Sequence, residues 1–334
     1  MKEDIFQSTY TQEDVQFEVP LRPRSLQEFI GQEDVKNQLH ILMDAAKQRG
    51  DVLGHCLFSG PPGLGKTTLA NILSSSMGAN IIVTSGPAIE KAGDLAGILT
   101  KLQDGDFLFI DEIHRLSRPI EEYLYPAIED FVLDLMIDTG PNARSVQVKL
   151  NRFTLVGATT RLGLLTSALR SRFALTCRLG YYQADELKTV VNRTAKLLNV
   201  DITDEGALAI AERSRGTPRV VNHLIRWVRD YWQTRASGKI DREIVQSALD
   251  LLNIDSKGLD EMDRKILEVM VKHYEGGPVG IKTLAVAVGE VADTIEEVHE
   301  PYLIKEGLIQ RTSKGRVVTT LGLQHIKLTI NTIQ

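Results

Sequence analysis

Residues 60–68 read Gly-Pro-Pro-Gly-Leu-Gly-Lys-Thr-Thr, a spacing that could bind the phosphates of a nucleotide. The segment lies between the apolar run Cys56–Ser59 and a stretch with helical periodicity. Gly60, Gly63 and Gly65 would allow consecutive backbone N–H groups to turn inward at a helix N-terminus, where these groups and the helix dipole hold phosphate oxygens. A chance glycine-rich turn is the weaker explanation, because strand, loop and helix stand in the order that this chemistry requires.

The polar side chains that end this segment would complete a nucleotide site. The Lys66 ammonium would neutralise the β- and γ-phosphates, and the Thr67 hydroxyl would ligate magnesium. Thr68, the next residue, is also predicted to bind the nucleotide. We therefore predict ATP and Mg²⁺ as cofactors.

A second apolar run, Phe107–Ile110, ends in two carboxylates. Asp111 would hold the magnesium through its coordination shell, and Glu112 would polarise the attacking water. An acidic pair after a strand is usually only a solvated strand end, but its position after the phosphate-binding segment favours the catalytic interpretation. His114 follows closely; a lone histidine beside a helix start is more often structural, and we give it no catalytic role.

Hydroxyl and guanidinium groups follow the next apolar run, Phe153–Gly157. Thr159 or Thr160 would place a hydroxyl beside the γ-phosphate, by the same argument from the end of a strand. Arg170 or Arg172 could stabilise the charge of the transition state, because an arginine fork is rigid and permanently cationic. Spacing alone does not choose within either pair.

A further arginine is placed by helix capping. In the segment Gly216-Thr217-Pro218-Arg219, Thr217 suits the N-cap and Pro218 the first helical position. Arg219 would then be presented at a helix start, toward the nucleotide. The predicted helix carries an apolar stripe at three- and four-residue spacing. Its members are Val221, Leu224, Ile225, Val228 and Trp232.

Three kinds of element must position these side chains. Between about Glu28 and Leu179, short apolar runs alternate with helical segments, which predicts an α/β layer with buried parallel strands. From Asp185 to Asn253 the helical pattern continues without such runs, which predicts a small all-helical domain. After the polar break at 255–258, three short helical segments and a strand-turn-strand signal around Lys314-Gly315 outline a winged helix. The predicted strands are Cys56–Ser59, Ile81–Thr84, Phe107–Ile110 and Phe153–Gly157.

The composition limits the class of protein. With 334 residues, 43% hydrophobic and 25% charged, and a net charge of -5, it is typical of a globular protein of two or three domains. No apolar run approaches the ~20 residues of a membrane span, so we expect a cytosolic protein with no membrane partner. Cys56 and Cys177 lie among apolar neighbours, which indicates buried thiols rather than a disulfide or zinc site.

Taken together, these motifs identify an AAA+ ATPase, and phrases along nearly the whole chain resemble the RuvB family of bacterial Holliday-junction branch-migration motors. The matching stretches are Leu21–Pro23, Phe29–Gln32, Gly157–Arg161, Leu169–Phe173, Gly216–Arg219, Glu300–Ile304, Arg311–Thr312 and Gly315–Arg316. We predict an α/β P-loop AAA+ core over residues 1–181, a small all-helical lid over 182–254, and a C-terminal winged-helix domain over 255–334.

The resemblance also implies roles for particular residues. Thr160 would be the first phosphate sensor, with Thr159 as the alternative. Arg172 would be a finger that acts on the ATP of the neighbouring subunit, and Arg219 the second sensor. The remaining nucleotide-binding residues, of which the first three line the adenine pocket, are Leu21, Arg22, Tyr182, Glu129, Asp130 and Phe131.

The partners follow from the same resemblance. The chain would form a homohexameric ring around duplex DNA and act on Holliday junctions together with RuvA, and with RuvC in the resolution complex. One rival class is an ATP-switched replication initiator, which also joins an AAA+ core to a winged helix. A second rival is a protein-remodelling unfoldase, which would leave a basic wing unexplained.

Charge in the last domain distinguishes two modes of DNA binding. The predicted recognition helix begins at Asp293, which resembles a capping box with Glu296, and its carboxylates would repel the walls of the major groove. After Tyr302, basic residues outnumber the single glutamate, so the wing is the better surface for sequence-neutral phosphate contacts. The alternative is a hairpin with ordinary solvating charges. The predicted DNA-binding residues are Arg311, Lys314 and Arg316, where Ser313-Lys314 replaces the Pro-Arg common in the family.

A β-hairpin is predicted within residues 131–150. Val146–Leu150 alternates strictly between apolar and polar residues, Leu133–Leu135 does so briefly, and Thr139–Asn142 makes a turn between them. Its apolar face either packs on its own domain or, as the resemblance implies, docks RuvA. The predicted partner-binding residues are Leu135, Ile137, Val146 and Val148.

Overall fold

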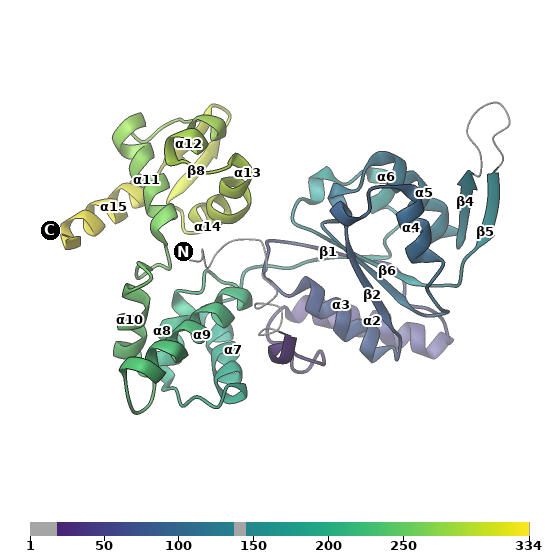
Figure 1. Cartoon of the computed structure of the whole chain (residues 1–334), viewed down its shortest axis with the longest axis horizontal. Coiled ribbons are helices and arrows are strands. Elements are labelled where there is room, and N and C mark those ends of the chain that lie inside the picture. Colours follow the sequence, from purple (N-terminus) through teal and green to yellow (C-terminus); the bar gives the residue numbers. More distant parts are fainter. Residues whose placement is uncertain (1–18, 137–144, 334) are drawn as a thin grey trace. The chain divides into compact units, whose positions relative to one another are not determined.

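The computed structural model describes residues 19–136 and 145–333, which form two compact units (Figure 1). One unit comprises residues 22–180, and the other joins the N-terminal residues up to Leu21 to residues 181–334. We describe the two units separately. In the described ranges, no helix is long and apolar enough to cross a membrane.

The first unit is built on a parallel sheet of five strands with helices on both faces (Figure 1). The strand order is β2-β3-β6-β1-β7. The strands are β1 (Cys56–Ser59), β2 (Ile81–Ser85), β3 (Phe107–Asp111), β6 (Thr154–Thr159) and β7 (Leu175–Arg178). The helices are α2 (Glu33–Arg49), α3 (Lys66–Ser76), α4 (Ala92–Leu99), α5 (Arg118–Glu129) and α6 (Ser167–Arg170). Short 3-10 turns of this unit are η2 (Gly86–Ala88), η3 (Ile113–Arg115) and η4 (Leu162–Leu164), while η1 (Val19–Leu21) belongs to the other unit.

The four apolar runs of the sequence coincide with strands of this sheet, although β2, at one edge, is only partly buried. Every residue of β1 and β6 is buried, as are the first four of β3. The predicted α/β layer and its four strands are therefore confirmed. Strand β7 was not predicted, because its sequence, Leu-Thr-Cys-Arg, is not a continuous apolar run. Cys56 and Cys177 are buried free thiols, as predicted, and burial raises the pKa of both.

The predicted hairpin is present as β4 (Val132–Met136) and β5 (Ser145–Lys149), a separate antiparallel pair that extends beyond the sheet (Figure 1). Leu133 lies opposite Val148, and Leu135 lies opposite Val146. Leu133 is fully buried, Val148 is half-buried, and Val146 is 43% exposed. The base of the apolar face thus packs on its own domain, while the face becomes exposed toward the tip. Ile137 lies outside the described residues.

The second unit begins with a helical bundle. It consists of α7 (Ala184–Leu197), α8 (Asp204–Glu212), α9 (Pro218–Arg235) and α10 (Arg242–Asp250). As predicted, the Thr217 hydroxyl caps α9 by accepting the Val220 N–H, and Pro218 opens the helix. The stripe of α9 is buried from Val221 to Val228, and only Trp232 is partly exposed.

The rest of the unit is a winged helix. It contains α11 (Glu261–Tyr274), α12 (Ile281–Val288), α13 (Ala292–Thr294), the π-helical segment η5 (Ile295–His299), α14 (Glu300–Lys305), the wing strands β8 (Ile309–Thr312) and β9 (Gly315–Val318), and α15 (Thr320–Ile333). The predicted wing turn at Lys314 is confirmed. The predicted capping box at Asp293 is wrong: the helix begins at Ala292, and its N-cap, Val291, makes no side-chain cap.

The π-helical segment has a local cause in the sequence. Pro301 lies one residue into α14, where its ring would clash with the carbonyl of a regular preceding turn and its nitrogen has no hydrogen to donate. A wider turn before the proline relieves this conflict. As a result His299 and Glu300, although adjacent, are both buried.

Candidate active site

The glycine-rich segment after β1 forms a phosphate-binding loop. Gly60, Gly63 and Gly65 all have positive φ angles, of 145°, 78° and 97°. A Cβ at Gly60 would clash with the carbonyl oxygen of Leu179, so only glycine fits there. The loop ends at the N-terminus of α3, where backbone N–H groups and the helix dipole favour an anion.

Lys66 is held within this loop. Its side chain is largely buried, and Nζ donates hydrogen bonds to the carbonyls of Gly60 and Pro61, both at 2.8 Å. The ammonium is therefore positioned by the backbone of the loop that would surround the phosphates. A lysine held in this way supplies positive charge at a defined place.

The sheet brings the predicted catalytic groups to one edge. Strand β6 lies between β1 and β3, and all three run parallel, so their carboxyl ends are neighbours. Ser59 is paired with Thr159, and the N–H of Gly60 donates to the Thr159 carbonyl at 3.1 Å. Ligands in open parallel sheets bind at this edge, where the strand order reverses.

The acidic pair ends β3 in an unusual backbone conformation. Asp111 Oδ1 accepts the Glu112 N–H at 2.9 Å, and Glu112 has a left-handed φ of 47°. Left-handed conformations cost energy for residues other than glycine and cluster at functional sites. The Glu112 carboxylate accepts a hydrogen bond from Arg115 Nη1 at 3.0 Å, and both side chains are partly exposed.

The structure separates the two threonines that end β6. The buried Thr159 hydroxyl accepts the Arg161 N–H at 3.0 Å and is hydrogen-bonded to His114 Nδ1 at 3.0 Å. Burial lowers the pKa of His114, which favours the neutral ring that can accept the Thr159 proton. Among the described residues, Thr160 makes no such side-chain hydrogen bond, so its half-buried hydroxyl remains able to meet a phosphate.

His114 is therefore a residue of this edge that the sequence interpretation passed over. Its contact joins the turn after β3 to the end of β6, across 45 positions of the chain. The sequence indicated a role for His114 only through its position three residues after Asp111. That position does not identify Thr159 as the hydrogen-bond partner of His114.

The donor set at this edge fits a magnesium ion. The Thr67 hydroxyl lies in the first turn of α3, beyond β1, and the Asp111 carboxylate ends β3. Hydroxyl and carboxylate oxygens are hard ligands of the kind that Mg²⁺ prefers beside a nucleotide phosphate. The two residues flank the end of β6, where Thr160 follows.

Arg172 is held in place by its own domain. Nη1 donates to the Ala168 carbonyl at 2.6 Å, Nη2 is paired with Glu129 Oε2 at 3.0 Å, and the guanidinium lies 4.4 Å from the centre of the Tyr125 ring. Arg170, the other candidate, is exposed. Glu129 thus contacts the candidate finger.

The other residues predicted to contact the nucleotide are divided between the two units. Asp130 is exposed, and the Phe131 ring packs edge-on against Phe153 in the core. Leu21 and Tyr182 are buried in the second unit, where the N–H of Tyr182 donates to the Gly216 carbonyl at 2.9 Å. Arg22 belongs to the first unit, and Arg219 is the second residue of α9.

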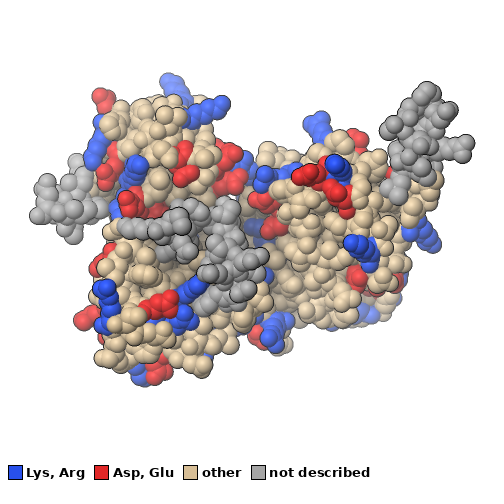
Figure 2. Space-filling view, in the orientation of Figure 1, with Lys and Arg blue, Asp and Glu red and all other residues tan. Residues whose placement is uncertain are grey.

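The wing arginines are paired with the recognition helix. Arg316 is buried and contacts Glu296 at 2.7 Å and Glu300 at 2.9 Å, while the more exposed Arg311 contacts the same two carboxylates at 2.6 and 2.8 Å. Lys314 is exposed at the turn. Counting charges along the sequence therefore overstated both the acidity of the helix and the basicity of the wing. In Figure 2, described acidic and basic side chains are interspersed on the visible face.

Three family models match consecutive parts of the chain. The "Holliday junction DNA helicase RuvB P-loop domain" matches residues 21–179, the "RuvB AAA lid domain" matches residues 182–255, and the "RuvB C-terminal winged helix domain" matches residues 256–327.

Known proteins match over nearly the full length. A "Holliday junction branch migration complex subunit RuvB" of Protochlamydia amoebophila is 62% identical, covering 98% of each chain. That of Flavobacterium psychrophilum is 56% identical, covering 95% of this chain and 93% of the relative. A solved structure of the Thermotoga maritima RuvB Holliday junction branch migration motor is 52% identical with a TM-score of 0.85, covering 92% of this chain and 98% of its own.

Proposed function

The chain belongs to the RuvB family, and from that premise we propose how its own residues carry out the family's reaction. It is an AAA+ P-loop ATPase that drives branch migration of Holliday junctions. One observation supports the assignment of roles most directly: β1, β6 and β3 end side by side, so the phosphate loop, the sensor threonines and the acidic pair meet at one edge.

At this edge, Lys66 and the loop N–H groups bind the β- and γ-phosphates of ATP. Thr67 and Asp111 hold Mg²⁺, which when bound neutralises phosphate charge. Glu112 orients and polarises the attacking water. Thr160 contacts the γ-phosphate.

The remaining nucleotide contacts come from other elements. Leu21, Arg22 and Tyr182 surround the adenine, and Arg219 contacts the phosphates from the start of α9. Arg172, oriented by Glu129, acts on the ATP of the neighbouring subunit. Asp130 and Phe131, which follow Glu129, contribute to binding of the nucleotide.

The assembly that we propose is a homohexamer around duplex DNA, acting in the cytoplasm with RuvA and, during resolution, with RuvC. The replication-initiator alternative is not favoured, because the relatives that match nearly the full chain are named for branch migration. The test is dissociation of a synthetic four-way junction by the full chain, with ATP and with or without RuvA. Dissociation that requires ATP and is accelerated by RuvA is expected; ATP-dependent binding without dissociation would favour the initiator.

The two threonines of β6 give a sharp comparison. We expect Thr160→Val to lower ATP hydrolysis about 100-fold, since a lost γ-phosphate contact weakens the transition state, with ATP affinity changed less. Thr159→Val should instead lower the melting temperature, because it removes the partner of His114 and Arg161. Steady-state hydrolysis and thermal unfolding of both variants decide the matter. Loss of hydrolysis confined to Thr159→Val would reverse the assignment.

The wing contacts phosphates through Lys314 and Arg311, while Arg316 holds the wing in position. Lys314→Ala should weaken binding to all DNA sequences alike and reduce the slope of log affinity against log salt by about one. The matched control is Lys265→Ala, which removes an exposed lysine from α11. Equal slopes for the control and Lys314→Ala, or a loss limited to one DNA sequence, would contradict the wing model.

The hairpin is the proposed RuvA surface, through Leu135, Ile137, Val146 and Val148, of which Val146 is exposed and Val148 half-buried. Val146→Lys should abolish detectable RuvA binding by calorimetry but leave the melting temperature and DNA-independent hydrolysis unchanged, because Val146 is already exposed. Gln147→Lys is the control: it adds the same charge at the next residue, opposite Asp134. If both variants bind RuvA normally, the hairpin is not the docking surface.

A further inference from the structure

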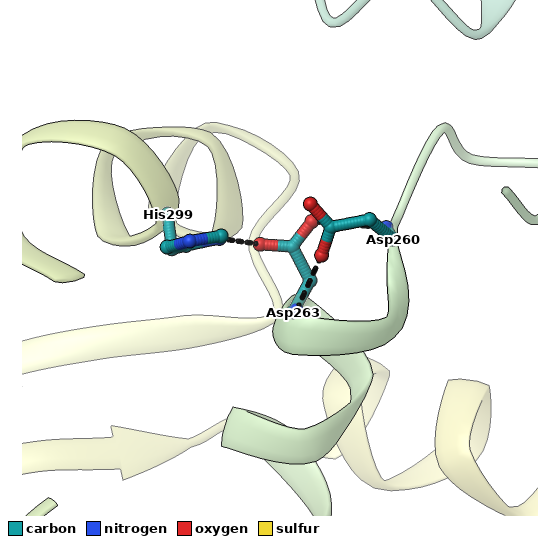
Figure 3. Close-up of side chains that lie close together, drawn as sticks. All are labelled: Asp260, Asp263 and His299. Carbon is teal, nitrogen blue, oxygen red and sulfur yellow. Dashed lines mark hydrogen bonds and ion pairs between the residues drawn. The ribbon is translucent and has the colours of Figure 1, made fainter. Parts of the chain in front are cut away.

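Four buried ionisable side chains meet where the helical bundle joins the winged helix. Arg215 lies in the loop before α9, Asp260 is the N-cap of α11, Asp263 is in its first turn, and His299 ends η5. Figure 3 shows Asp260 and Asp263 together at the start of α11, with His299 facing Asp263 from another segment. We call this set the junction cluster.

Asp263 is the centre of the junction cluster. His299 Nδ1 lies 2.7 Å from Asp263 Oδ1, and Arg215 Nη2 is hydrogen-bonded to Asp263 Oδ2. The same Arg215 nitrogen lies 3.0 Å from Asp260 Oδ2, and Arg215 Nε donates to the Gly258 carbonyl at 2.9 Å. The side chains of Asp263 and His299 are 0% and 1% exposed, and that of Arg215 is 5% exposed.

The carboxylates and imidazole are close enough to hold a metal ion, but Arg215 already supplies the positive charge. Burial alone would lower the pKa of His299, but the hydrogen bond to Asp263 and the charges of Asp263 and Asp260 together raise it. Arg215 and His299 thus face the two carboxyl groups at the start of α11. A buried ion cluster is weak evidence for stability, but it can fix a specific arrangement of the elements that contribute to it.

The junction cluster continues into the wing. Glu300, next to His299, is buried and accepts hydrogen bonds from Arg316 at 2.9 Å and Arg311 at 2.8 Å. The helix of η5 and α14 thus contacts Arg215 through His299 and Asp263, and holds the wing through Glu300. Any displacement of this helix must move both contacts.

At the other end, the cluster is continuous with the start of α9. Arg215 has a left-handed φ of 53°, and the N–H of Thr217, the N-cap, donates to the Ser214 carbonyl at 3.0 Å. Only Gly216 and the Thr217 N-cap thus separate Arg215 from the first residue of the helix that carries Arg219. A second contact of α14 lies nearby: Lys305 Nζ, at the end of this helix, is 4.8 Å from the centre of the Tyr181 ring.

We propose that Arg215 is a positioning residue that couples the α9 helix start to the DNA-contacting wing through Asp263, His299 and Glu300. The proposal rests on the phosphate contact of Arg219 and the DNA contact of the wing proposed above. When nucleotide turnover moves the start of α9, the buried cluster carries the movement to the wing, since separating its charges is strongly unfavourable. Arg215 itself contacts neither ATP nor DNA.

The main test is Arg215→Lys in the full chain, which keeps the charge but loses the fork that reaches Gly258 and both carboxylates. Four quantities are measured: hydrolysis without DNA, DNA affinity, melting temperature, and ATP consumed per four-way junction dissociated with RuvA. We expect hydrolysis and DNA affinity to stay close to wild type, while ATP consumed per junction rises about fivefold or more.

The matched control is Arg213→Lys. Arg213 is equally buried and only two residues away, but its guanidinium hydrogen bonds go to Ala209 and Gln246, within the helical bundle. It should leave the ATP cost per junction unchanged. A further variant, His299→Asn, keeps a donor near the position of Nδ1 without the ring and should raise the cost in the same direction.

The outcomes separate this proposal from the proposed function. If wild-type protein shows no ATP-dependent junction dissociation, the function itself fails. If wild type is active and Arg215→Lys has an unchanged ATP cost, or if Arg213→Lys raises it equally, the coupling role is overturned. Loss of folding in both Arg215→Lys and His299→Asn would make the cluster a purely structural element and would also overturn it.

Discussion

Glu112→Gln is expected to lower ATP hydrolysis by about 10²- to 10⁴-fold while ATP still binds. The glutamine amide has nearly the size of the carboxylate. The variant is therefore expected to keep the left-handed backbone conformation of residue 112, with its φ of 47°. What is lost is the negative charge that polarises water. Measurement of turnover and of equilibrium nucleotide binding on the same preparation separates the two effects.

Two further variants control this experiment. Lys66→Ala should abolish binding itself, because the ammonium held by the Gly60 and Pro61 carbonyls would no longer offset phosphate charge. Arg115→Ala removes the hydrogen-bond donor to Glu112 and should leave hydrolysis at wild-type level or above it. If Glu112→Gln turned over ATP at the wild-type rate, Glu112 would be a strand-end residue and another base would have to be found.

The sequence predicts the edge of the sheet well because the relevant signals are local. Strands β1 and β3 appear as apolar runs followed directly by the glycine-rich loop and by Asp111. The cap at Thr217 is equally local, since a side chain there meets a backbone group three residues on. Such features depend on neighbours in the chain, so reading the chain is enough to place them.

The features that were missed depend on distant partners. The wing arginines appeared as free positive charge, but Glu296 and Glu300 neutralise them across 11 to 20 positions of sequence. Likewise, Arg215 and Asp263 are 48 positions apart, and no spacing rule joins them. The capping box expected at Asp293 was wrong, since the helix begins at Ala292 without a side-chain cap, and the π-helical segment that follows was not predicted.

The position of Arg172 in the fold argues that it serves a neighbouring subunit. Arg172 precedes β7, whose first residue, Leu175, is paired with Cys56 at the beginning of β1. The phosphate loop follows the opposite end of β1, which spans four residues, or roughly 13 Å at ~3.3 Å per residue. The ion pair with Glu129 holds the Arg172 guanidinium near the beginning of β1, at the end opposite the phosphate loop. Glu129 follows Ile128, whose carbonyl contacts His55, and His55 directly precedes β1.

Arg172→Ala is therefore expected to bind ATP normally but to lose about 10³-fold or more in turnover, because an arginine finger stabilises charge that develops only in the transition state. Arg170→Ala is the matched control, since Arg170 is exposed and only two residues away, and it should retain hydrolysis. Glu129→Gln, which weakens the ion pair that orients the finger, should give an intermediate rate.

Mixing distinguishes a finger supplied in trans from one acting in cis. Arg172→Ala and Glu112→Gln should each be inactive alone, because every interface of either ring lacks one half of the site. A mixed ring contains some interfaces where an intact Arg172 faces an intact Glu112, and these should recover hydrolysis once subunit exchange is verified by a fluorescence label. Junction dissociation need not recover with it, since migration can require coordinated firing around the ring. If exchange occurs and hydrolysis stays absent, Arg172 acts within its own subunit or Arg170 is the finger.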